Sequence, residues 1–165
     1  MRLRLGLALL MLLLSASPGR PADAPATGAG LFRMDVMGVI TDPQTGVPLV
    51  FLRAREDKRE LFLAVGRFEA QAIALALQGM RVPRPQTHDL MLEALHRLQA
   101  RVLRAVIVEL RQGTYLASLV LDAGGRELVL DARPSDAIAL ALREESSICA
   151  AEVAFIHPST PEASP

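Results

Sequence analysis

The sequence has little of several residue types that mark common functional classes. It holds one cysteine, Cys149, in 165 residues, which excludes an internal disulfide and a cysteine-cluster metal site. It has no tryptophan and a single tyrosine, so there is little material for an aromatic platform that stacks nucleobases. Neither sign of charge is in excess, because 18 basic residues are matched by 18 acidic ones. This balance argues against a strongly basic protein that binds nucleic acid without regard to sequence.

The first residues have the pattern of a targeting signal. Arg2 and Arg4 precede an apolar run at residues 5–14, and small residues follow at 15–17. This order is typical of a secretory signal peptide, and the run is too short to cross a hydrocarbon core about 30 Å thick. We therefore expect residues 1–26 to be a signal peptide and leader, with the cleavage site left open. The mature chain would be exported, periplasmic or secreted, without a stable membrane anchor.

The remaining sequence has the composition of a folded protein, with 51% hydrophobic and 22% charged residues. Residues 18–30 are rich in proline, alanine and glycine and are typical of a linker. Residues 158–165 have a similar composition and predict a flexible tail. One domain is therefore expected at residues 31–157.

Alternating and helical patterns predict the elements of this domain. The strands are expected at residues 34–40, 49–54, 61–65, 102–110, 115–121, 127–131 and 153–156. The helices are expected at residues 69–79, with Gly79 just past the end, at 88–99, with Thr87 as N-cap, and from Pro134 to about Arg143.

A short repeat relates the two halves. The hexapeptide Ala-Ile-Ala-Leu-Ala-Leu occurs at residues 72–77 and again at 137–142, and similar strands start at Glu60 and Glu127. We interpret this as two β-β-β-α units, either duplicated or merely alike in composition. The fold class is therefore α+β: an antiparallel or mixed sheet with two or three buried helices.

The segment from Asp131 to Asp136 lies where a strand meets a helix. Helix N-termini favour anions, and Arg133 can bind a phosphate or carboxylate through two hydrogen bonds. Ser135 and Asp136 can help to hold a ligand. The alternative is that Ser135 and Asp136 cap the helix and Arg133 clamps a neighbouring acid. Spacing alone favours this structural interpretation.

The sequence holds three histidines, and one of them starts a predicted helix. His88 is a candidate general base or metal ligand, with Asp89 as its partner. The alternative is a capping turn in which Asp89 complements the helix dipole. His96 falls on the polar face of the same helix and is expected to be solvated. The histidine spacing has no zinc-binding pattern, and the chain has no Walker loop, GxSxG or CxxC motif.

Glu69 occupies the first turn of the first helix, as Asp136 does in the repeated unit. If the units are equivalent, the two acids are equivalent too. Paired acids near a histidine can hold a divalent cation for phosphodiester hydrolysis. The same acids also suit a first helical turn with no catalysis implied.

Three strings, in this order, resemble the bifunctional nuclease domain family: GRFEAQAIA at residues 66–74, RPQTHDL at 84–90 and DARPSDAIALA at 131–141. The resemblance covers about residues 34–156. It implies a compact mixed α/β domain with DNase or RNase activity, acting on DNA or RNA. The site candidates that it marks are Glu69, His88, Asp89, Asp131, Arg133, Ser135 and Asp136. Our own hypothesis assigns catalysis to the four acids and His88, and substrate binding to Arg133, Ser135 and the nearby Arg84.

The resemblance leaves the cofactor unknown, with a divalent cation such as Mg²⁺ or Mn²⁺ compatible with the acids. A nuclease needs a local positive groove, which a set of arginines can supply: Arg53, Arg55, Arg81, Arg84 and Arg133.

Two hypotheses from different classes follow. An exported phosphodiesterase predicts that Glu69, His88, Asp131 and Asp136 converge in one cleft. A non-catalytic binding or assembly module predicts that Arg133 pairs internally and that the acids point to separate places. In such a module edge strands or apolar helices drive dimerisation, and we expect a homo-oligomer, such as a dimer.

Overall fold

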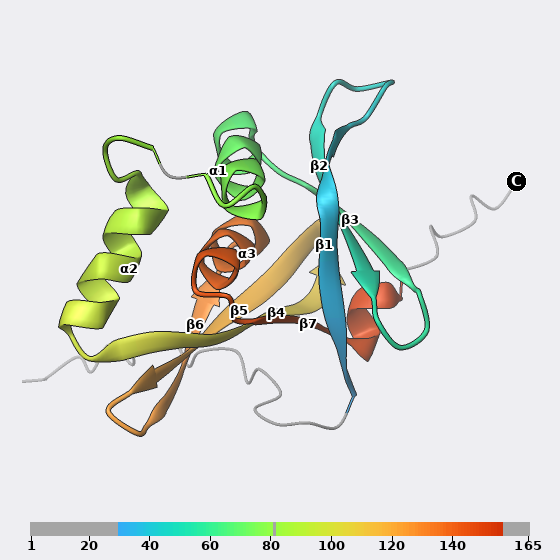
Figure 1. The fold of residues 1–165 in the computed structure, drawn as a ribbon. Helices are drawn as coiled ribbons and strands as arrows, with labels where there is room; N and C mark the ends of the chain where they lie inside the picture. The colour runs from blue at the N-terminus through green and yellow to red at the C-terminus, as the bar shows by residue number, and fades with distance from the viewer. Residues whose placement is uncertain (1–29, 81, 157–165) are drawn as a thin grey trace, which may run out of the picture.

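Two three-strand meanders form most of the fold in the computed structural model, which describes residues 30–80 and 82–156 (Figure 1). The first meander consists of β1 (Leu31–Thr41), β2 (Pro48–Ala54) and β3 (Glu60–Ala64). The second consists of β4 (Ala100–Arg111), β5 (Thr114–Ala123) and β6 (Glu127–Ala132). The expected signal peptide and leader, 1–26, and the expected tail, 158–165, lie outside the described residues.

A seventh strand, β7 (Ser147–Ala151), joins the two meanders into one mixed sheet of order β3-β2-β1-β7-β4-β5-β6. It pairs antiparallel with β1 and parallel with β4, and all other pairs are antiparallel. The prediction of a last strand at 153–156 was wrong, because residues 153–155 belong to a 3-10 helix, η1 (Glu152–Phe155), and Ile156 follows it. The strand precedes this helix in a segment that has one strong strand former, Ile148, and is held by neighbours on both sides.

Three helices pack against this sheet: α1 (Arg67–Leu77), α2 (Thr87–Arg97) and α3 (Pro134–Arg143). Helix α3 is the central one, because five consecutive residues from Ala137 to Ala141 are buried. A helix that is apolar on every side must be covered on every side, and α3 contacts the sheet, α1 and α2. The predicted α+β class with a mixed sheet is confirmed. None of the described helices combines the length and the apolar character needed to cross a bilayer.

Helix boundaries follow the predicted signals closely at two ends. Gly79 follows α1 with a left-handed φ of 61°, and the Met80 N–H donates to the Leu75 carbonyl across that turn. Helix α3 begins at Pro134 as expected. The N-cap of α2 is Gln86 rather than Thr87, because the Asp89 carboxylate reaches back to the Gln86 N–H at 2.9 Å. This bond places the start of the helix one residue earlier.

Helix α2 has a single buried residue, Leu92, and is fastened to α3 by two polar contacts. Arg143 Nε donates to Asp89 Oδ1 at 2.7 Å, near the start of α2. His96 Nε2 lies 2.9 Å from Glu144 Oε2, near the end of α2. The expectation that His96 is solvated is confirmed, since 45% of its side chain is exposed, and its contact with Glu144 is an addition to that prediction. Polar contacts at both ends supply part of the attachment that apolar burial gives α1 and α3.

The apolar core lies between the helices and the sheet. Its largest fully buried side chains include Leu52, Leu61, Ile107, Ile138 and Leu140, from both meanders and from α3. Cys149 is buried as predicted, and burial raises the pKa of its thiol. The two predicted β-β-β-α units are present as β1-β2-β3-α1 and β4-β5-β6-α3. Their origin by duplication stays a prediction.

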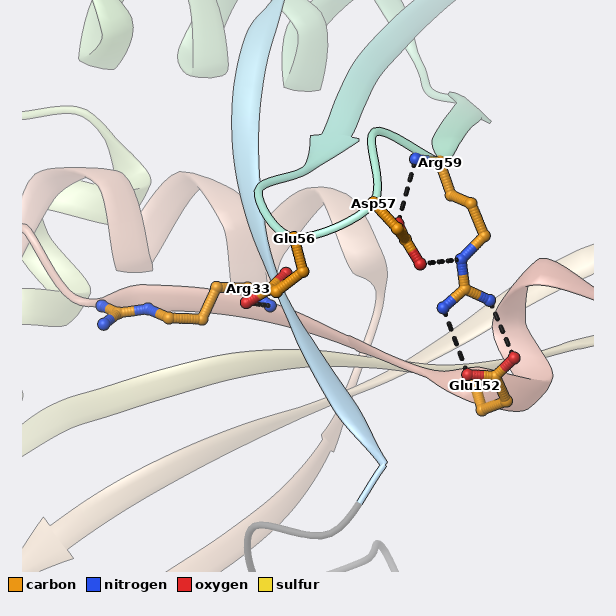
Figure 2. Close-up of polar contacts among 5 residues, drawn as sticks. All are labelled: Arg33, Glu56, Asp57, Arg59 and Glu152. Carbon is orange, nitrogen blue, oxygen red and sulfur yellow. Dashed lines mark hydrogen bonds and ion pairs between the residues drawn. The ribbon is translucent and has the colours of Figure 1, made fainter.

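An arginine clamp ties the turn before β3 to the end of the domain (Figure 2). The Arg59 guanidinium lies over the rings of Phe32 and Phe155, at 4.1 and 4.2 Å from their centroids. It also contacts the carboxylates of Asp57 and Glu152, at 2.6 and 2.8 Å. The first meander and η1 are thus joined by one side chain, at a distance from the predicted site residues.

Candidate functional site

The N-terminal turns of the helices lie around one cleft of about 480 Å³. Glu69 is the third residue of α1, His88 the second residue of α2, and Asp136 the third residue of α3. Glu69 and Asp136 thus both lie in a first helical turn, as predicted, at the same distance from the start of their helices. The residues that line the cleft are Phe68, Glu69, Gln71, Ala72, Pro85, Gln86, Thr87, His88, Arg133 and Asp136.

Arg133 links the two acids of the cleft. It is the N-cap residue of α3, and its Nε and Nη2 lie 2.7 and 3.1 Å from the two carboxylate oxygens of Asp136. Its Nη1 lies 3.1 Å from Glu69 Oε1. These three contacts use three of the five N–H groups of a guanidinium. Because 65% of the side chain is exposed, donors remain for a ligand that enters the cleft.

His88 faces the other side of the same carboxylate. Its Nε2 lies 3.2 Å from Asp136 Oδ1, and only 14% of its side chain is exposed. Burial acts to raise the pKa of Asp136, but the hydrogen bonds from Arg133 and His88 outweigh it and hold the pKa below its ordinary value of 3.8. Asp136 is therefore ionised at neutral pH. A charged carboxylate favours the His88 tautomer with the proton on Nε2, which leaves the lone pair on Nδ1.

The residues of the cleft do not fit a divalent cation as arranged. Across residues 30–80 and 82–156, no three histidine, cysteine, aspartate or glutamate side chains are placed to hold one metal ion. The Arg133 guanidinium contacts both Glu69 and Asp136 and is the positive charge that these two acids share. Hard cations such as Mg²⁺ require several oxygen ligands around one point.

Asp89 is one of the residues that fasten α2 to α3, and it does not line the cleft. Its Oδ1 accepts from Arg143 and its Oδ2 from the Gln86 N–H. Burial acts to raise the pKa of Asp89, and these two hydrogen bonds lower it below the ordinary value of 3.8. The side chain next to His88 thus holds α2 in place, while the His88 ring contacts a carboxylate 48 residues away.

Three further predicted site residues lie outside the cleft lining. Asp131 pairs with Ser118 across β5 and β6, and Ser118 alternates with the core residues Ala117 and Leu119. Asp131 therefore projects from the sheet face opposite the core. Ser135 is buried in the first turn of α3. Arg84 is exposed in the loop that precedes α2, beside the cleft residue Pro85.

The expected positive groove is smaller than predicted. Of its four described arginines, only Arg133 lines the cleft. Arg53 pairs with Glu60, and Arg55 pairs with Asp35. Arg81 lies outside the described residues. Neighbouring acids on the first meander thus neutralise two of the arginines.

Sequence reasoning missed two features of the cleft. Phe68 lines it and is 77% exposed, and an aromatic residue among the polar residues that start α1 was the available signal. Gly66, the N-cap of α1, lies directly beneath the Glu69 carboxylate, so that an added Cβ would overlap Glu69 Oε2. The glycine leaves room for Glu69 to fold back over the helix start and meet Arg133.

Replacing Gly66 by alanine is expected to lower the activity of the cleft while changing the stability of the fold little. The backbone there has φ −68° and ψ 158°, which alanine adopts without strain, so the free energy of unfolding should change by about 1 kcal/mol or less. Glu69 must swing away and release Arg133, which should lower any activity of the cleft several-fold. Thermal unfolding and initial rates would measure the two effects. Glu69→Ala should cause a similar loss, and the double variant little more. Additive losses would contradict this coupling.

The fold and site together define an α+β domain with a polar, histidine-containing cleft at the N-termini of its helices. The family model of the bifunctional nuclease domain matches residues 50–159. This range includes all three sequence strings and every residue that lines the cleft. The chain belongs to the bifunctional nuclease domain family.

Relatives in two groups of organisms share part of the chain. The uncharacterized protein Rv1829 of Mycobacterium tuberculosis is 39% identical over 108 residues, which are 66% of this chain and 64% of that protein. Bifunctional nuclease 1 of Oryza sativa subsp. indica is 34% identical over 93 residues, which are 53% of this chain and 28% of the rice protein. The match thus spans less than two thirds of the length of either relative.

Proposed function

We propose that this chain is a nuclease that hydrolyses phosphodiester bonds of DNA or RNA in the cleft described above. The observation that carries the proposal is the convergence of Glu69, His88, Arg133 and Asp136, which come from three separate sequence strings. Phosphodiester hydrolysis can use a general base that is oriented by a carboxylate, together with a guanidinium that stabilises the phosphate charge. Membership of a family named for nuclease activity supports it.

His88 is the general base in this proposal. Its Nε2–H donates to Asp136, so Nδ1 takes a proton from the attacking water as the new phosphorus–oxygen bond forms. Asp136 orients the ring and stabilises the imidazolium that results. The remaining Arg133 N–H groups bind the phosphate oxygens, where negative charge increases as the leaving oxygen departs and takes a proton from solvent.

Action outside the cytoplasm is part of the same proposal. It rests on the signal-like pattern of residues 1–26, where a positive start precedes an apolar run and small residues.

One observation favours a second candidate function, a non-catalytic binding module. All three nitrogens of the Arg133 guanidinium contact carboxylates of the chain itself, as a structural clamp would. On this alternative the cleft binds a ligand without cleaving it.

A hydrolysis assay distinguishes the two candidates. Purified chain would be incubated with labelled single-stranded DNA and RNA, in Mg²⁺, in Mn²⁺ and in chelator. A His88→Ala/Asp136→Ala double variant, verified as folded by circular dichroism, provides the background. Cleavage that is lost in the double variant is the expected result. Equal cleavage by both proteins would indicate a contaminant, and no cleavage by the folded wild type would favour the binding module.

A further inference from the structure

An exposed aromatic ring stands at the mouth of the cleft. Phe68 is the second residue of α1, it lines the cleft, and 77% of it is exposed. A single exposed apolar residue needs no explanation in itself. Phe68 differs from an ordinary surface residue because it shares one cleft with His88 and Arg133. An apolar flat surface therefore lies beside the groups proposed to bind and cleave a phosphodiester.

The charges of the cleft cannot supply much affinity for a polyanion. Among the residues that line it, the positive charge of Arg133 is offset by the negative charges of Glu69 and Asp136. Arginine and lysine side chains that neutralise phosphates supply most of the non-specific affinity of proteins for nucleic acid, and this affinity falls steeply with salt. A nucleic acid that enters this cleft must gain affinity from another part of the nucleotide. The exposed ring of Phe68 is suited to contact the nucleobase.

We infer that Phe68 is a stacking platform for a nucleobase, and that the cleft accepts single-stranded nucleic acid. This inference rests on the proposed function for the identity of its occupant. Stacking on an aromatic side chain tolerates any base, because every base has a π-face. In a duplex each base is already stacked and paired, so its face is not free to meet Phe68. The cleft volume of about 480 Å³ lies within the range of small-ligand sites.

The geometry also gives the platform a place in the reaction. Phe68 and Glu69 are consecutive residues of the same turn, and Glu69 contacts Arg133 at 3.1 Å. A base held on Phe68 would bring its own phosphate toward Arg133 and His88. Phe68 is thus a positioning residue for the substrate, and its removal should raise KM more than it lowers kcat.

Binding measured without cleavage tests the inference. Fluorescence anisotropy in chelator at low temperature would compare a labelled oligothymidylate of 12 nucleotides with an abasic strand of equal length and charge. Wild type should bind the thymidylate about fivefold or more tighter than the abasic strand. Phe68→Leu, which keeps apolar bulk but loses the ring, should remove that preference, and Phe68→Tyr should restore it. A duplex of the same sequence should bind no better than the abasic strand.

A matched control uses another residue of equal exposure. Leu98, just past the end of α2, is also 77% exposed and does not line the cleft. Leu98→Ala should leave the preference for bases unchanged. The salt dependence of thymidylate binding should be shallow, because few phosphate contacts contribute.

The outcomes separate this inference from the proposed function. Equal binding of the base-bearing and abasic strands by wild type, or an unchanged preference in Phe68→Leu, would overturn the stacking platform even if hydrolysis persists. Base-dependent binding that requires the ring would support the platform even if no hydrolysis occurs, and only the nuclease proposal would then fail.

Discussion

Replacing His88 by glutamine is expected to lower the rate of phosphodiester hydrolysis by a factor of about 10²–10⁴, the usual contribution of a positioned general base. The glutamine amide keeps an N–H that can donate to Asp136, so the contact at the start of α2 is preserved. It has no nitrogen that accepts a proton near neutral pH. The loss should therefore appear in kcat, with KM little changed, in initial-rate measurements on labelled single strands.

The chain offers a closely matched control for this substitution. His96 is also on α2, and its Nε2 also contacts a carboxylate next to α3, at 2.9 Å from Glu144 Oε2. It does not line the cleft. His96→Gln makes the same substitution at the same kind of histidine–carboxylate contact and should leave the rate within about twofold of wild type. If the two variants lose activity equally, the His88 effect is structural and its role as base is contradicted.

The parts of this site that sequence reasoning predicted are those encoded locally. Helical patterns placed Glu69 and Asp136 in first turns, and the structure has both at the third helical position. The alternative prediction was that first-turn acids only cap their helices, and Asp89 does this by accepting from the Gln86 N–H. Identical local chemistry thus gives two outcomes. What separates them is the partner, which is Arg133 for the cleft acids and Arg143 for Asp89.

The parts that sequence reasoning missed depend on pairing between distant segments. Nothing near Asp89 indicates Arg143, which lies 54 residues away. The position of β7 was missed because alanine and cysteine form a poor strand in isolation, and only burial between β1 and β4 makes them one. Asp131 is different, since strict alternation along β6 already assigns it to the face opposite Leu130. The sequence alone therefore already separates Asp131 from the core face of the sheet.

The Arg133 contacts lead to the second large effect, a loss of activity coupled to a higher pKa of Asp136. Arg133→Ala removes the phosphate donors and should lower kcat/KM by a factor of about 10²–10³, as for the loss of a transition-state donor. Arg133→Lys keeps the charge without the planar fork and should recover only a small part of the rate.

A titration of Asp136 shows whether Arg133 acts through this carboxylate as well as on the substrate. Burial acts to raise the pKa of Asp136, and the hydrogen bonds from Arg133 and His88 lower it, the one from Arg133 more strongly. Without the guanidinium, the pKa must rise, so Asp136 stays protonated to a higher pH and no longer orients the imidazole there.

The pKa of Asp136, followed by NMR of its side-chain carboxyl carbon, should therefore be higher in Arg133→Ala than in wild type. Glu69→Gln leaves the Arg133–Asp136 contacts in place and should leave this pKa close to its wild-type value. An unchanged pKa in Arg133→Ala would limit Arg133 to substrate binding and remove Asp136 from its control.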